Sequence, residues 1–191
     1  MADDTLPPRC GIAFKEWAGI CEALAQGQQS LILRKGGIAE GPKGFSPEHD
    51  LFWLYPTRVH EAEQGLKDGA SAPLDTSPHD VVELRALAKV EAVWFADRLD
   101  VLEALDDLHA WTAETVAKRF HYRRPGLWVL GVRAFRTPGP VAIAAAPEHA
   151  GCKTWVPLDP PPSTAGAEPT LDDEGFAVRM DRLRSSLGRR P

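Results

Sequence analysis

Long apolar runs are absent from the 191-residue sequence, and so is an apolar leader at its start. The longest apolar stretch, residues 141–147, falls far short of the roughly 18 residues that a membrane-spanning helix needs. The first residues, MADDTLPPR, are acidic and lack the apolar core of a signal peptide. The sequence therefore predicts a cytoplasmic protein with no membrane partner.

Cysteine is scarce, with three residues and no CxxC pair, which argues against a disulfide framework and a zinc site. The P-loop pattern GxxxxGK[ST], the HExxH motif and the PD…(D/E)xK signature of metal nucleases are also missing. His–acid pairs occur only on separate predicted loops. We therefore expect no metal and no cofactor, and the residues by themselves establish no reaction.

Acidic residues are missing from residues 115–147, although the chain has a net charge of −5. The cations of this stretch are Lys118, Arg119, Arg123, Arg124, Arg133 and Arg136. The acids crowd residues 61–114 instead. Two interpretations stay open: a positive face on an acidic protein, or arginines that pair with those acids across the fold.

Hydrophobic periodicity predicts an α+β fold. Phe14, Trp17, Cys21 and Leu24 recur at helical spacing and predict a helix over residues 14–24. Apolar runs predict strands at 30–34, 51–55 and 127–135, with 141–145 pairing back onto 127–135 after the TPGP turn. Residues 81–96 favour two strands or one bent strand, and helices are expected between residues 99 and 120.

Three divisions of the chain are predicted. Residues 1–158 form a single α+β domain, and residues 159–170, with three consecutive prolines, form a linker. Residues 171–191 form a C-terminal amphipathic helix, because Phe176, Met180, Leu183 and Leu187 share one face. This helix either docks on the domain or contacts a partner protein.

Four blocks of sequence appear in a recognisable order: AFKEWAGICEALAQGQQSLILRKGGIAEG, FWLYPTRVHE, LHAWTAETVAKRFHYRRPGL and GCKTWVPL. Together they span residues 13–158, and this region resembles a bacterial family catalogued as domain of unknown function 1802. The resemblance implies a bacterial protein with a link to nucleic-acid restriction or defence.

A second resemblance concerns the segment GQQSLILR, residues 27–34. It is similar to the G-x-K-x-x-E-x-R motif of PUA-like barrels, including the ASCH group. Gly27 and Arg34 match the motif, whereas Gln29 and Ile32 stand where it has Lys and Glu. The resemblance implies a small mixed β-barrel with flanking helices.

Three short runs carry residues suited to binding anions. Residues 34–37, Arg-Lys-Gly-Gly, follow a predicted strand and can offer cations and backbone N–H groups, or can form a simple turn. Residues 56–61 offer Thr57, Arg58 and His60 at the exit of a buried strand, or form a solvated loop. Residues 119–124 interleave aromatics with arginines, as stacking on bases requires, or form a helix end that caps carbonyls.

The leading hypothesis is a nucleic-acid or nucleotide-binding module whose ligand is RNA, DNA or a nucleotide. One alternative is an enzyme acting on a phosphorylated substrate or nucleic acid with His60 as acid/base. Another is a protein–protein adaptor that works through the C-terminal helix. The candidate ligand-binding residues are Arg34, Lys35, Gly36, Gly37, Trp53, Thr57, Arg58, His60, Arg119, Tyr122, Arg123, Arg124 and Lys153.

Overall fold

A seven-stranded mixed sheet dominates the fold. The computed structural model describes residues 5–35, 40–41, 44–45, 48–58, 65–70, 78, 80–149, 151 and 153–188. The strands run in the order β2–β7–β6–β5–β1–β8, with β9 beside β7. Their bounds are β1 Ile12–Trp17, β2 Leu31–Arg34, β5 Leu51–Thr57, β6 Val81–Ala96, β7 Leu127–Ala144, β8 Trp155–Pro157 and β9 Glu168–Pro169. A separate pair joins β3 (Glu40–Gly41) to β4 (Gly44–Phe45).

The sheet confirms the predicted α+β class. β1 pairs in parallel with β5, and the other neighbours in the large sheet are antiparallel. β2 and β8 stand at the two ends of the pairing order. Within the part of the chain that the structure describes, no backbone ladder joins these two ends, so the curved sheet is not a closed barrel.

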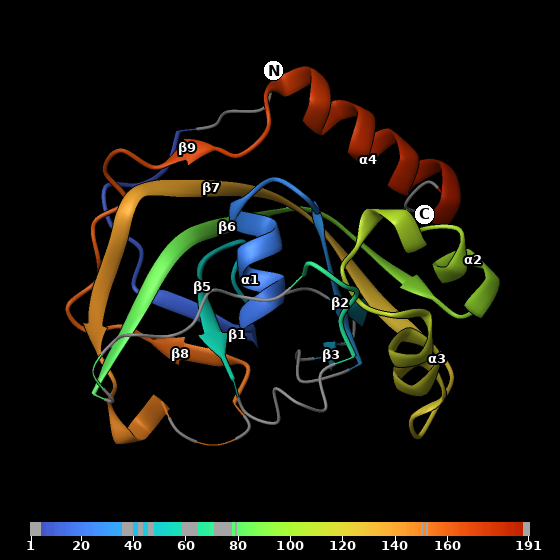
Figure 1. Cartoon of the computed structure of the whole chain (residues 1–191), viewed down its shortest axis with the longest axis horizontal. Coiled ribbons are helices and arrows are strands. Elements are labelled where there is room, and N and C mark those ends of the chain that lie inside the picture. Colours follow the sequence, from blue (N-terminus) through green and yellow to red (C-terminus); the bar gives the residue numbers. More distant parts are fainter. Residues whose placement is uncertain are drawn as a thin grey trace.

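β6 and β7 are the long strands that give the sheet its curvature (Figure 1). Residues 81–96 form one bent strand, and β7 is continuous through the TPGP segment. Residues 141–144 therefore pair with residues 81–84 of β6, which corrects the expected pairing with 127–135. The four residues 137–140 of β7 stand opposite the single residue Arg85 of β6, and two prolines that cannot donate to a ladder fall in this irregularity.

The first element differs from its prediction. Residues 12–17 form β1, and α1 (Ala18–Ala25) begins only afterwards. Neighbouring side chains explain the strand: Ala13 lies in one core cluster with Trp53, and Phe14 lies in the main core cluster. Such alternation, together with pairing to β5 and β8, overrides the helical spacing of the apolar residues.

Helices fill and flank the curve of the sheet. α1 lies beneath the arch of β6 and β7, and α2 (Leu99–Glu103) and α3 (Ala113–His121) lie beyond one end of it (Figure 1). Thr112 caps α3, since its hydroxyl accepts a hydrogen bond from Thr115 N at 3.3 Å. Among the described helices, none is long and apolar enough to cross a membrane.

The C-terminal segment packs against the sheet. The Pro-rich residues 159–170 include β9, which pairs with β7. α4 (Asp173–Leu187) then lies across β6 and β7 (Figure 1). Its side chains Phe176, Met180 and Leu183 are buried in the main core cluster. The apolar stripe predicted for this helix is thus covered by the rest of the domain.

Candidate functional site

The side chain of Arg34 crosses the gap between the two ends of the sheet, which we call the seam. Arg34 is the last residue of β2, and its Nη2 donates to Thr154 Oγ1, immediately before β8, at 3.0 Å. Its Nη1 lies 3.4 Å from Lys15 O on β1, and its guanidinium sits 4.5 Å from the centre of the Phe14 ring. A side chain therefore bridges the strands that no described backbone ladder joins.

Glu16 is the anionic group of the seam. It is only 2% exposed, and its Oε2 lies 3.4 Å from Arg34 Nη1. Its Oε1 accepts a hydrogen bond from Trp17 N at 2.8 Å, and its backbone oxygen accepts one from Thr57 Oγ1 at 3.2 Å. The structure thus brings the predicted residues Arg34 and Thr57 together around an acid that the motif analysis missed.

Arg119 of α3 adds a second guanidinium to this cluster. It lies over the Trp17 ring, 4.8 Å from its centre. Burial lowers the pKa of Arg119, an effect that Arg34 reinforces and Glu16 opposes. Arg119 Nη1 and Arg34 Nε are buried and have no hydrogen-bond partner among the described residues. Each such donor costs roughly 1–3 kcal/mol. We call Glu16, Arg34 and Arg119 the seam cluster.

Lys35, the next residue, anchors the turn between α3 and β7. Its Nζ donates to Phe120 O at 2.8 Å and Gly126 O at 2.9 Å, and also to Arg124 O. Burial lowers the pKa of Lys35. Since three carbonyls occupy its ammonium, Lys35 supports this turn from beneath.

The outer surface of this turn is basic and aromatic. Tyr122 is 56% exposed, Arg123 and Arg124 are exposed, and the Arg123 guanidinium lies 5.1 Å from the Tyr122 ring centre. Phe95 of β6 is 49% exposed, and a Cβ on Gly126 would come within 2.3 Å of its ring. We call Phe95, Tyr122, Arg123 and Arg124 the basic–aromatic turn. In the described part of the chain, neither arginine forms an ion pair.

The remaining predicted site residues lie elsewhere. Trp53 is fully buried and donates from Nε1 to Cys10 O at 3.1 Å, so it is a core residue and offers no stacking surface. Arg58 is half-buried beyond the end of β5, and Lys153 is exposed before β8. Gly36, Gly37 and His60 fall outside the described residues, so the enzyme hypothesis stays a prediction.

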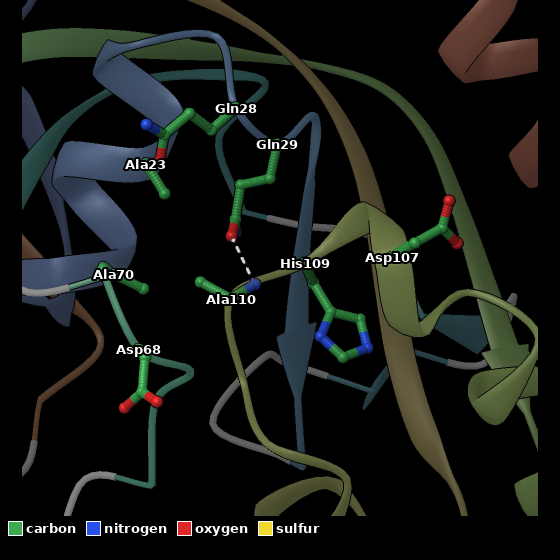
Figure 2. A pocket seen from close by; sticks show the side chains of 9 residues that line it. Ala23, Gln28, Gln29, Asp68, Ala70, Asp107, His109 and Ala110 are labelled. Carbon is green, nitrogen blue, oxygen red and sulfur yellow. Dashed lines mark hydrogen bonds between the residues drawn. The ribbon is translucent and has the colours of Figure 1, made fainter.

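A separate pocket of about 280 Å³ opens between α1 and the segment around residue 109 (Figure 2). Gln29 is buried there and joins the two segments: Ala110 N donates to its Oε1 at 3.1 Å, and its Nε2 donates to Leu31 O at 2.9 Å. Both ring nitrogens of His109 are buried without a partner among the described residues. Burial lowers the pKa of His109 to about 4.

Metal chemistry finds no support in the described part of the chain, where no group of three or more His, Cys, Asp or Glu side chains could hold an ion. Two arrangements among the described residues present cations suited to an anionic ligand, namely the seam cluster and the basic–aromatic turn. The consecutive residues Arg34 and Lys35 connect them, because Arg34 belongs to the cluster and Lys35 donates to Arg124 O.

Comparison with known families agrees with the ordered sequence blocks. The model of a domain of unknown function (DUF1802) matches residues 13–182. The chain belongs to this family. The DUF1802 match extends beyond residue 158 and includes the Pro-rich segment and most of α4. No curated protein matches the chain.

The chain is also similar to solved structures of ASCH from Zymomonas mobilis. One, described as the crystal structure of ASCH, is 12% identical, covers 91% of this chain and 93% of its own, and has a TM-score of 0.46. A serine-to-alanine mutant of that protein is 10% identical, with coverages of 93% and 99% and a TM-score of 0.46. A tyrosine-to-phenylalanine mutant is 12% identical, with coverages of 90% and 96% and a TM-score of 0.46.

Proposed function

We propose that this chain binds single-stranded nucleic acid at the basic–aromatic turn. The observation that carries the proposal is the exposure of Tyr122 and two arginines on one turn, with the exposed ring of Phe95 from β6 beside Gly126 of that turn. An exposed aromatic ring gains little packing energy in the unbound protein. Every nucleic-acid base, however, offers a π-face on which such a ring can stack. Arginines beside them supply the charge that phosphates require. An unpaired strand fits this surface best, since stacking needs bases that are already free.

The surroundings of the turn support this proposal. Residues 115–147 contain no acid that would repel a phosphate. Lys35 donates hydrogen bonds to three backbone carbonyls at the turn, and these bonds restrain the backbone that carries Arg123 and Arg124. The Phe95 ring packs against Trp128 in a tilted arrangement, with ring centres 4.8 Å apart, which restrains its ring. A preorganised surface loses less entropy when it binds.

Fluorescence anisotropy with short single strands of RNA and DNA, and with the matching duplex, tests the proposal. We expect the single strands to bind more tightly than the duplex, with an affinity that falls steeply as salt rises. The double variant Arg123→Gly, Arg124→Ala should flatten the logarithmic salt slope by about 1.4, since each lost phosphate contact removes about 0.7. Tyr122→Ser should weaken binding without changing that slope.

A control is Arg184→Ala, which removes one exposed arginine from α4, against two arginines in the double variant. It changes net charge in the same direction but lies outside the turn, so binding should stay close to that of the unaltered chain. Undetectable binding, or binding that ignores salt, contradicts the proposal.

A further inference from the structure

The seam cluster holds more positive charge than its own residues neutralise. Two guanidiniums, of Arg34 and Arg119, lie near a single carboxylate, Glu16, which is paired with Arg34. Burial already lowers the pKa of Arg119. A buried charge is normally paired, because water no longer stabilises it. The cluster therefore has one positive charge in excess.

The same cluster holds hydrogen-bond donors without acceptors. Arg34 Nε and Arg119 Nη1 are buried and have no partner in the described part of the chain. Trp155 Nε1 is in the same condition, and its ring contacts Phe14, the ring beneath the Arg34 guanidinium. Native proteins leave few buried donors unpaired, so a group of them indicates a missing acceptor. The acceptor must be anionic to balance the charge as well.

We infer that the seam cluster binds a terminal phosphate group of the nucleic acid or nucleotide, with Arg34 and Arg119 as its ligands. A phosphate monoester carries between one and two negative charges near pH 7 and three acceptor oxygens. The N–H groups of a guanidinium can donate hydrogen bonds to two phosphate oxygens at once. This inference rests on the proposed function, because the strand that lies on the basic–aromatic turn supplies the phosphate.

The burial of the cluster selects an end over an internal phosphate. The Arg34 side chain is only 14% exposed, so an anion that reaches its guanidinium must be small or must have a free end. An internal phosphodiester carries a nucleoside on both sides and has no free end to insert. Arg34 and Lys35 are consecutive, and Lys35 contacts the turn through Arg124 O. A strand on the turn therefore has its end within reach of the seam.

The test compares three versions of one short single strand, with a 5′-phosphate, with a 3′-phosphate, and with hydroxyls at both ends. We expect one of the two phosphorylated strands to bind at least about tenfold more tightly than the strand with hydroxyls at both ends. In Arg119→Gln this ratio should fall to about one. In the double variant Arg123→Gly, Arg124→Ala all three strands should weaken together, and the ratio should remain.

A second measurement separates failure of this inference from failure of the proposed function. Inorganic phosphate should raise the melting temperature of the unaltered chain, acetate at equal ionic strength should raise it less, and Arg119→Gln should remove the difference. Arg119→Lys keeps the charge over Trp17 if the glutamine variant does not fold. Equal affinity for the three strands overturns the inference even when they bind. If no strand binds, the proposed function fails, and absence of the phosphate effect then also overturns the inference.

Discussion

Arg123 occupies a backbone conformation that is unusual for its residue type. Its φ of +62° lies in the left-handed region, where a side chain costs roughly 1–2 kcal/mol. We expect Arg123→Gly to raise the free energy of unfolding by about 0.5–1 kcal/mol, because relief of strain exceeds the extra entropy of glycine. The same change should weaken strand binding. Denaturant unfolding measures the change in stability, and anisotropy measures the change in affinity for the strand. If stability and affinity both fall, the left-handed conformation of Arg123 is not a strain that is kept for binding.

His109 should make stability depend on pH. Burial lowers its pKa from 6.5 to about 4, so the folded protein resists protonation that the unfolded chain accepts. The free energy of unfolding therefore has its full value above pH 6.5 and decreases as pH falls toward 4, because only the unfolded chain takes up the proton in that range. Between about pH 7.5 and 4.5 the loss amounts to roughly 2–3 kcal/mol. His109→Leu should remove this part of the pH dependence, measured by urea unfolding; an unchanged profile contradicts the assignment.

The sequence singled out some of the residues that the structure brings together in the candidate site. Arg34, Thr57 and Arg119 were candidates, and they converge on the seam. Glu16 was missed because it belongs to β1, which the helical spacing of its neighbours concealed. The available signal was that Glu16 is the one acid among the apolar residues of that segment. Phe95 was missed because exposure of an aromatic cannot be read from a strand with irregular register.

At the scale of elements, α4 packs against the domain through several contacts and is not an independent appendage. Its residue Asp173 pairs with the buried Arg133 of β7 at 2.6 Å, and Arg182 forms a bidentate pair with Asp107. Trp94 also donates from Nε1 to Gly188 O at 3.1 Å. The sequence predicted the helix correctly, but its docking surface could not be predicted, since β6 and β7 supply it from distant parts of the chain.

Removal of residues 159–191 should therefore destabilise the domain. It exposes the core beneath Phe176, Met180 and Leu183 and leaves the buried Arg133 without Asp173. The loss is on the order of 5 kcal/mol, which is comparable to the whole stability of a typical domain. Met180→Ala should cost about 2–5 kcal/mol and Val178→Ala, on the exposed face, about zero. A truncated chain with an unchanged melting temperature contradicts this prediction and restores the predicted domain boundary at residue 158.

At the scale of the whole molecule, charge is divided between regions. The chain is acidic overall, yet residues 115–147 contain none of its acids. Under the proposed function, a strand approaches the basic–aromatic turn because no acid of residues 115–147 repels its phosphates there. The sequence alone left open whether the cations of this stretch were already paired. Arg133 is paired with Asp173, while in the described structure Arg123 and Arg124 stay exposed. The link to restriction or defence that the family resemblance implies stays a prediction.

The wrapping of the C-terminal segment also constrains how the chain folds. Cys10 N donates to Pro162 O, Thr164 N donates to Pro8 O, and β1 pairs with β8. One edge of the first strand pairs with β5, but the other edge waits for a partner about 140 residues later in the sequence, and such non-local pairings are slow to form. During synthesis, β1 leaves the ribosome long before β8, β9 and α4 exist. β5 can pair with one edge of β1 early, but the other edge lacks β8 for that interval, so we expect the nascent chain to expose an unpaired strand edge until its C-terminal part has emerged.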